Sequence, residues 1–235
     1  MISFVVPTYN NTEELATTLK SIGACKSNGF EIIIVNGGKP VKVDENVTLI
    51  QENDHGVYDA MNKGLARCSN EYVIFLNSGD QLLPNNLPNF SQKKDLYVFD
   101  SLEVDLRGNQ LYKRSKKINS LPYGMITHHQ ALIFKKEIIL VNKLKYDLTY
   151  KIASDYKFFL DFADCASSIE EVNSPLCIFH KGGLSHSKRH EGLFEQFQIR
   201  SKKYNLFFAV YIMFIQFLKI LIRYNAEWLY SAIKR

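Results

Sequence analysis

The chain has 235 residues, of which 46% are hydrophobic and 23% are charged, so we expect one sizeable folded domain and exclude a disordered chain. Its net charge of +5 suits a phosphate-bearing ligand or an anionic membrane surface but is too small to predict nucleic acid binding, so no nucleic acid partner is expected. The four cysteines form no C-x-x-C pair, and Pro7 shortens an N-terminal apolar run that lacks basic residues. These features predict reduced thiols in a cytosolic protein without a signal peptide.

The first 80 residues alternate short apolar runs with amphipathic stretches. The runs are rich in β-branched residues and predict buried strands, whereas the amphipathic stretches predict helices between them. Strands are expected at residues 2–6, 30–35, 47–51 and 72–76, and helices from about residue 12 and over residues 57–67. Pro7 is expected to end the first strand, and Asn10 or Asn11 to cap the first helix. This order predicts an α/β fold with a mostly parallel sheet and flanking helices.

Polar, turn-rich segments follow each of these strands. In such sheets, ligands bind beyond the carboxyl ends of the strands, so we expect the binding site to be formed by these segments. The segments are Pro7 to Asn10, Asn36 to Gly38, Glu52 to Gly56, and Asn77 to Asp80.

The second part of the chain is less regular. Strands are expected at residues 96–99, 102–106, 131–134 and 168–179, with a hairpin turn at 107–109 and a break at Pro175. Helices are expected over residues 155–163 and from Glu191 onward. We therefore expect residues 1–190 to form the main domain and residues 191–235 a C-terminal helical segment.

Two acidic motifs in the first half point to phosphate and metal chemistry. Asp80 lies in the loop that follows a buried strand. A carboxylate at this position can hold Mg²⁺ or Mn²⁺, and the ion helps to neutralise a leaving diphosphate. The alternative is a turn in which Asp80 caps the following residues. In the second motif, Asp54 and Gly56 precede a helix, and Asp59, Asn62 and Lys63 lie within one turn of that helix. These residues either share a binding site or belong to a capped helix whose charges are solvated.

Three further motifs lie in the second half. Asp155 precedes an apolar helix and is either an N-cap or a catalytic carboxylate. His129 is either structural or a ligand of sugar or phosphate. Gly182 and Gly183 stand between basic residues, and such a loop either closes over a diphosphate or is a flexible linker.

Taken in order, these motifs resemble glycosyltransferase family 2, which has the GT-A fold, and in particular its branch that builds bacterial surface polysaccharides. The resemblance runs from Ser3 to about Ser187. It is carried by Phe4 to Asn10, Glu52 to Gly64, Phe75 to Asp80, His129-Gln130, Ala153 to Tyr156, and Gly182 to Ser185.

The resemblance implies a role for each motif. Asp155 would be the general base, and Asp80 would lie at or beside a bound Mg²⁺ or Mn²⁺. The donor nucleotide and its sugar would be bound by Pro7, Thr8, Tyr9, Asn36, Asp54, Asp59, Asn62, Lys63, Asn77, His129, Gly182 and Gly183. Two positions depart from the family: Asn36 replaces the usual Asp, and the Asp-x-Asp positions read Asn77-Ser78-Gly79 with the acid one step later. A single carboxylate still suits Mg²⁺, which keeps several waters.

The implied activity is an inverting transfer of a hexosyl or N-acetylhexosaminyl group from a nucleoside-diphosphate sugar to a glycan on a polyprenyl diphosphate, as in lipopolysaccharide O-antigen synthesis. One alternative is a nucleotidyltransferase-like nucleotide-sugar enzyme. The chain has no G-x-G-x-x-G or P-loop motif, which weighs against dinucleotide-binding and P-loop enzymes. Another is a non-catalytic, membrane-associated homologue, which Asn36 and Asn77 support.

The C-terminal segment is apolar from Leu206 to Ile222, with only Gln216 and Lys219 interrupting it. We expect a helix that lies in the membrane interface, anchored by Tyr224, Trp228 and Tyr230. The protein would then be peripheral at the inner face of the cell membrane. A helix that packs in a core or in an oligomer, and a helix that spans the membrane, are the alternatives.

Overall fold

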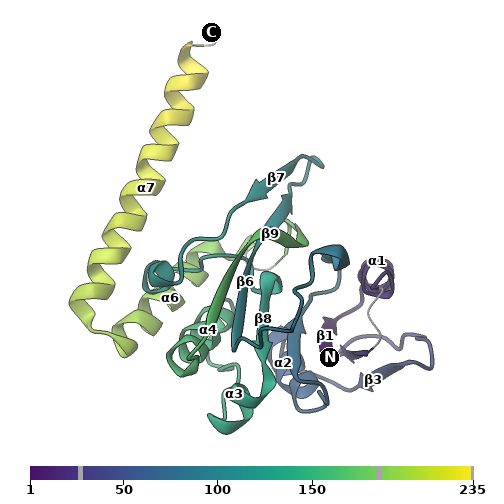
Figure 1. The fold of residues 1–235 in the computed structure, drawn as a ribbon. Helices are drawn as coiled ribbons and strands as arrows, with labels where there is room; N and C mark the ends of the chain where they lie inside the picture. Colours follow the sequence, from purple (N-terminus) through teal and green to yellow (C-terminus); the bar gives the residue numbers. More distant parts are fainter. Residues whose placement is uncertain (26–28, 184–186, 234–235) are drawn as a thin grey trace.

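The computed structural model describes residues 1–25, 29–183 and 187–233, and beyond Lys219 it describes only the side chains of Leu221 and Ile222. In this part of the chain, nine strands form one sheet in the order β3-β2-β1-β4-β8-β6-β9-β5, with β7 paired to β6 (Figure 1). The strands are β1 (Ile2–Thr8), β2 (Phe30–Asn36), β3 (Val47–Gln51), β4 (Tyr72–Phe75), β5 (Gln81–Leu82), β6 (Leu96–Val104), β7 (Gln110–Lys113), β8 (Leu132–Lys135) and β9 (Ile169–His180).

Parallel pairing joins β1, β2, β3 and β4, and also joins β6 to β9. Antiparallel pairs attach β8, β7 and β5. The helices are α1 (Thr12–Gly23), α2 (Val57–Leu65), α3 (Lys136–Val141), α4 (Ser154–Cys165), α6 (Arg189–Lys203) and α7 (Leu206–Ile233), with short 3-10 turns at Pro84–Asn86, Ile118–Tyr123 and His129–Ala131. This arrangement confirms the predicted α/β fold.

Each face of the sheet carries its own core. Phe4 and Val6 point to the face that α1 covers, whereas Val5 points to the face that α2 and α4 cover. A strand buried on both faces has no polar side to alternate with, which explains why β1, β2 and β4 are nearly continuous apolar runs.

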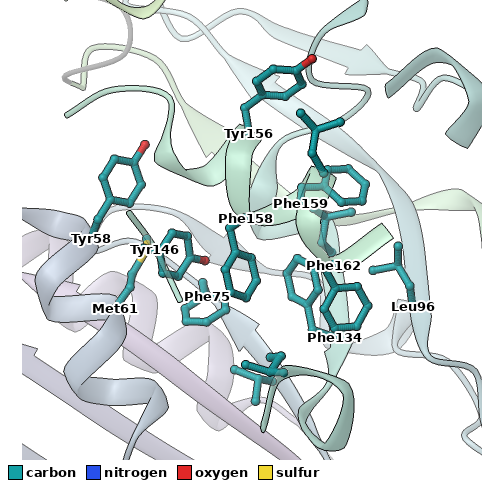
Figure 2. Close-up of a cluster of buried hydrophobic side chains, with 14 of the residues drawn as sticks. Tyr58, Met61, Phe75, Leu96, Phe134, Tyr146, Tyr156, Phe158, Phe159 and Phe162 are labelled. Atoms are coloured by element: carbon teal, nitrogen blue, oxygen red, sulfur yellow. The ribbon is translucent and has the colours of Figure 1, made fainter. Parts of the chain in front are cut away.

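Aromatic side chains fill the core between α2, α4 and the sheet (Figure 2). Phe158 of α4 stacks on Tyr146 at 4.5 Å between ring centroids, and Phe162 packs edge-on against Phe134 at 4.9 Å. Phe75 of β4 also contacts Tyr146, at 5.1 Å. Because large aromatic rings bury much surface and pack in defined geometries, they fix α4, and with it the N-terminal residues of that helix, against the sheet.

Three expected boundaries are wrong, and each has a local reason. Pro7 does not end β1. Proline has no N–H to donate, but at this position its carbonyl oxygen accepts a hydrogen bond from Ser78 N at 3.3 Å. Residues 96–106 do not form two strands: β6 runs unbroken through the polar Asp100, whose carboxylate accepts hydrogen bonds from Tyr112 Oη at 2.6 Å and Ser115 N at 2.7 Å. Pro175 shifts the register of β9 without ending it.

Two capping expectations also fail in part. Asn11 occupies the N-cap position of α1, but its side chain makes no capping hydrogen bond and contacts the Glu14 carboxylate instead. At α4 the N-cap residue is Ala153, so Asp155 lies within the first turn. The four cysteines are free thiols; Cys177 is buried and the other three are half-buried.

The C-terminal segment is helical as expected and consists of two helices that meet at Tyr204 and Asn205. α6 packs against the main domain, and α7 contacts α6 through the buried Ala209 and Ile212. Most of the other described side chains of α7 are exposed, Phe207 by 87%, and the helix extends away from the body (Figure 1). It is therefore not a core helix of this chain. Within the described residues, no helix has the length and apolar character that crossing a membrane requires.

Candidate active site

A cavity of about 970 Å³ opens where the loop after β4, the start of α4, the end of β9 and one side of α6 come together. Both Asp80 and Asp155 line it, although 75 positions separate them in the sequence. Six of the predicted site residues line this cavity: Asn77, Asp80, His129, Asp155, Gly182 and Gly183.

Asp80 is held in the floor of the cavity by contacts from three elements. Gly79, with φ of +99°, lets the chain turn after β4, and Thr18 Oγ1 of α1 donates a hydrogen bond to the Asp80 carbonyl at 2.7 Å. The Asp80 carboxylate accepts hydrogen bonds from Gln130 Nε2 at 2.5 Å and from His180 N at 3.0 Å. Burial raises the pKa of Asp80 to about 7, so taking this carboxyl out of water outweighs the two hydrogen bonds that favour its charge.

Several polar atoms around Asp80 are buried without a partner. Among the described residues, Asn77 Oδ1, Gln130 Oε1 and His180 Nδ1 have no hydrogen bond. A buried polar atom that is left unpaired is costly, so three of them in one cavity wall indicate groups that await a ligand. The same part of the chain contains no group of three His, Cys, Asp or Glu side chains suited to a metal ion.

Asp155 lies in the first turn of α4 and lines the same cavity. Tyr156 N donates a hydrogen bond to Asp155 Oδ1 at 2.8 Å, and the Tyr58 hydroxyl lies 3.3 Å from the same oxygen. Burial raises the pKa of Asp155 to about 6. The loop before Asp155 is fixed by Glu195 of α6, whose carboxylate accepts three backbone hydrogen bonds, from Lys151, Ile152 and Ala153, each at 2.8 Å.

His129 lies beside Asp155, with 3.6 Å between His129 Nδ1 and Asp155 Oδ2. Burial lowers the pKa of His129 to about 4, so the imidazole is neutral at pH 7 and the contact is not an ion pair. His129 Nε2 is another buried atom without a hydrogen-bond partner.

A second group of predicted residues, Pro7, Thr8, Tyr9, Asn36 and Asp54, lies at the carboxyl ends of β1, β2 and β3, outside the cavity lining. Thr8 Oγ1 donates to Ser78 Oγ at 3.3 Å and so connects this group to the cavity. Asn36 is fully buried; its amide donates to Lys39 O and accepts from Gly38 N, which organises the loop after β2.

Asp54 and Gly37 close the same edge of the sheet. A Cβ atom at Gly37 would lie only 2.0 Å from Asp54 Oδ2, so a larger residue here would displace the Asp54 side chain. Tyr9 is 66% exposed and stands at the rim. The group therefore presents one exposed ring and a constrained backbone, rather than a pocket of its own.

The three residues predicted on α2 lie elsewhere. Lys63 forms ion pairs with Asp59 at 3.2 Å and Glu52 at 3.3 Å. Asn62 bonds the backbone of Tyr146 through both its amide atoms, at 2.9 and 2.8 Å, and lines a separate cavity. These side chains hold α2 in place, and none of them lines the cavity that Asp80 and Asp155 share.

The glycine loop forms part of the rim. Gly182 adopts φ of +126°, which favours glycine, and Gly183 follows it at the edge of the cavity. Leu184, Ser185 and His186, which complete this motif, lie outside the described residues.

Sequence reasoning missed Glu195 and Lys113, and named Gln130 and His180 only as neighbours of other candidates. Nothing in the local sequence around Glu195 or Lys113 marks them as site residues. The unpaired atoms and the long-range hydrogen bonds that single out these four side chains exist only in the folded chain.

Comparisons with known proteins identify the family of this chain. Residues 3–133 match the sequence model of the family described as Glycosyl transferase family 2. A PGL/p-HBAD biosynthesis glycosyltransferase of Mycobacterium bovis is 23% identical over 67% of this chain and 68% of its own length. The poly(ribitol-phosphate) beta-N-acetylglucosaminyltransferase TarP of Staphylococcus aureus is 25% identical over 68% of this chain and 57% of its own length.

Solved structures share the fold. The crystal structure of S. aureus TarS 1-349 in complex with UDP-GlcNAc has a TM-score of 0.68 and 17% identity, covering 90% of this chain and 70% of that one. The mannosyltransferase PcManGT from Pyrobaculum calidifontis, in complex with GDP-Man and Mn²⁺, has a TM-score of 0.62 and 14% identity, covering 96% and 79%. Since the family match spans more than half of the residues and the fold agrees over 90% of the chain, this chain belongs to glycosyl transferase family 2 and is a glycosyltransferase.

Proposed function

We propose that the enzyme is an inverting glycosyltransferase, which moves a hexose or N-acetylhexosamine from a nucleoside-diphosphate sugar to a hydroxyl group of a glycan on a polyprenyl diphosphate. The observation that carries this proposal is that Asp80 and Asp155, from separate motifs, line one cavity. The neighbours with this fold were solved with UDP-GlcNAc and GDP-Man, which supports a nucleotide-sugar donor of this class. Polysaccharide or lipopolysaccharide O-antigen synthesis is the setting that such an acceptor implies.

The residues around Asp80 fit a divalent cation. The carboxylate, together with the unpaired oxygens Asn77 Oδ1 and Gln130 Oε1, offers the hard oxygen ligands that Mg²⁺ and Mn²⁺ prefer. These three residues would hold the ion. When bound, the ion supplies stabilisation of the charge that develops on the leaving nucleoside diphosphate.

Asp155 is the group that we assign to proton transfer. Its carboxylate is mostly ionised at pH 7, because even the raised pKa of about 6 lies below that pH. It accepts the proton of the acceptor hydroxyl as that oxygen attacks the anomeric carbon from the face opposite the diphosphate, which inverts the anomeric centre. A pKa nearer to the working pH makes a carboxylate a stronger base than an exposed aspartate.

Other residues orient these two groups. Glu195 fixes the loop that carries Asp155, and Tyr58 lies against the Asp155 carboxylate. On the donor side, Thr8, Tyr9, Asn36 and Asp54 at the carboxyl ends of β1 to β3 are assigned to the nucleotide, and Gly182 and Gly183 to the loop that covers it.

We also propose that α7 lies on the inner surface of the cell membrane. Its described side chains Phe207, Tyr211, Phe214 and Phe217 are each more than half exposed, which leaves a large apolar surface in water. From Leu206 to the end, the sequence holds one acidic and four basic residues, so its charge complements anionic lipids. A lipid surface is the partner that both properties fit, and a peripheral location would bring the enzyme to a lipid-linked acceptor.

The experiment that tests the donor assignment is a thermal-stability screen of nucleotide sugars, with and without Mn²⁺. A donor present at about 100 times its Kd should stabilise the fold by about 2.7 kcal/mol. The donor that stabilises the protein is then incubated with a lipid-linked glycan, and the anomeric configuration of the product is read by NMR. Release of pyrophosphate would indicate a nucleotidyltransferase instead, and retention of configuration would exclude the single displacement.

A further inference from the structure

Four basic side chains line the active-site cavity, and two of them, Lys113 and Lys181, form one cationic wall around Glu103. Lys113 of β7, Lys181 after β9, Lys151 before α4 and Arg189 of α6 all line it. Glu103 is the carboxylate that pairs with two of them: its Oε1 lies 2.5 Å from Lys181 Nζ, and its Oε2 lies 3.8 Å from Lys113 Nζ. Two ammonium groups therefore share one carboxylate, which leaves a net positive charge on this wall.

Specific side-chain contacts hold this wall in place. His128 stacks on Phe179 at 4.0 Å between ring centroids, and its Nδ1 lies 2.9 Å from Ser101 Oγ. Its Nε2 lies 3.3 Å from Lys113 Nζ, and burial lowers the pKa of His128 to about 3, so the neutral ring accepts from the ammonium. The side chain of Glu103 is only 12% exposed, whereas those of Lys113 and Lys181 are 43% and 34% exposed. The carboxylate thus lies beneath, and the two ammonium groups face the cavity.

The position of this wall separates it from the part of the proposed donor site at the ends of β1, β2 and β3. Thr8, Asn36 and Asp54, which are assigned to the nucleotide, lie at the ends of β1, β2 and β3. Lys113 ends β7 and Lys181 follows β9, and both of these strands pair with β6 (Figure 1). Lys181 directly precedes Gly182 and Gly183, which are assigned to the loop that covers the nucleotide. His128 precedes His129, whose ring contacts Asp155. The cationic wall and the proposed base therefore line the same cavity, and neighbouring histidines contact each of them.

We propose that Lys113 and Lys181 bind a phosphate group of the acceptor. A phosphate offers several negatively charged oxygens, and two ammonium groups held by one half-buried carboxylate can each donate a charge-assisted hydrogen bond to it. The inference rests on the proposed function, because it assigns this wall to the second substrate of the same cavity. The phosphate belongs either to a lipid diphosphate or to a phosphodiester polymer, and the chemistry that the lysines recognise is the same.

The test is calorimetric titration of the full chain with farnesyl diphosphate and with glycerol 3-phosphate, with farnesol as the uncharged control. Each titration is made with and without saturating amounts of the nucleoside diphosphate that the donor screen identifies. The variants are Lys113→Gln, Lys181→Gln and Glu103→Gln. The control is Lys93→Gln, an exposed lysine that pairs with Glu71 just before β4 and does not line the cavity.

We expect a phosphate probe to bind in the presence of the nucleoside diphosphate, and farnesol not to bind. Each lysine variant should weaken the binding about 10- to 100-fold, as expected for a hydrogen bond between charged groups. Lys93→Gln should change nothing, and Glu103→Gln should leave the binding intact or strengthen it, whereas loss of a purely structural ion pair would weaken it. Stronger binding of farnesyl diphosphate would identify a lipid acceptor, and stronger binding of glycerol phosphate a polymer; both support the proposal.

Three results would overturn it: absence of phosphate binding to the wild-type chain, unchanged binding in both lysine variants, or displacement of the probe by the nucleoside diphosphate. Failure of the proposed function has a different signature. In that case no nucleotide sugar stabilises the protein, while the lysine-dependent phosphate titration can still be measured.

Discussion

Replacing Asp155 with asparagine should separate its catalytic role from its effect on stability. The substitution keeps the size of the side chain and an oxygen that can accept the hydrogen bond from Tyr156 N, which is 2.8 Å long in the wild type. It removes the charge that accepts the proton, so turnover should fall by about 10²- to 10⁴-fold while donor affinity is kept. The wild-type enzyme should lose turnover as the pH falls through about 6, where burial raises the Asp155 pKa and the base becomes protonated.

The same substitution should stabilise the protein at high pH. The pKa of Asp155 is raised from 3.8 to about 6, and each pKa unit corresponds to about 1.4 kcal/mol, so the ionised carboxylate lowers the free energy of unfolding by about 3 kcal/mol at pH 8. The contribution of the protonated carboxyl to the free energy of unfolding is fully present below pH 3.8 and is lost as the pH rises through about 6. Asp155→Asn should therefore exceed the wild type in urea unfolding at pH 8 and match it near pH 4.

The control for both measurements is Asp161→Asn on the same helix, since Asp161 forms ion pairs with Lys157 and Lys203 and does not line the cavity. It should keep turnover and gain no stability at pH 8. If Asp155→Asn retains turnover within tenfold of the wild type, Asp155 is not the base. If the variant is less stable than the wild type at pH 8, its carboxylate supports the fold and the reasoning from burial is wrong.

Further predictions concern the cation, the packing of α2 and the C-terminal helix. Asp80→Asn should abolish the part of donor stabilisation that depends on Mn²⁺ while the protein still folds, and an unchanged metal effect would remove Asp80 from this role. Gly64→Ala places a Cβ atom 2.4 Å from Val5 Cγ1 and should destabilise the protein by about 1–3 kcal/mol in urea, whereas Gly23→Ala, with no atom within 4 Å, should not. Removing the residues after Asn205 should abolish flotation with phosphatidylglycerol vesicles, and equal flotation of both chains would contradict membrane docking by α7.

The first half of the fold was predictable because its strands are buried on both faces. A short run of β-branched residues such as Ile32–Val35 has few alternatives to a central strand, and the observed β2 begins and ends within one residue of the expected range. The errors arose where polar residues enter the sheet. Asp100 interrupts the apolar run of β6, and its buried carboxylate is stabilised by hydrogen bonds from Tyr112 and Ser115.

The candidate site was predictable where its residues follow strands in a recognisable order. Asp80 and Asp155 were found in this way, and they line one cavity as expected. Glu195 was not found, because its function depends on backbone groups 42 to 44 positions earlier in the sequence. A carboxylate within an amphipathic helix has the same local appearance whether it faces solvent or holds an active-site loop.

Asp80 and Asp155, the two acidic residues assigned to the chemistry, are also acidic residues whose ionised forms the fold disfavours. Burial raises the pKa of both Asp80 and Asp155 well above the usual range of an aspartate, so each charge is unfavourable in the folded chain without ligands. The unpaired Asn77 Oδ1 and His129 Nε2 add to this cost in the same cavity. Such groups persist where the bound state compensates them, because a ligand that satisfies them stabilises the folded chain by mass action. The cavity is therefore shaped for an occupied state, and its unpaired atoms indicate which groups the substrates contact.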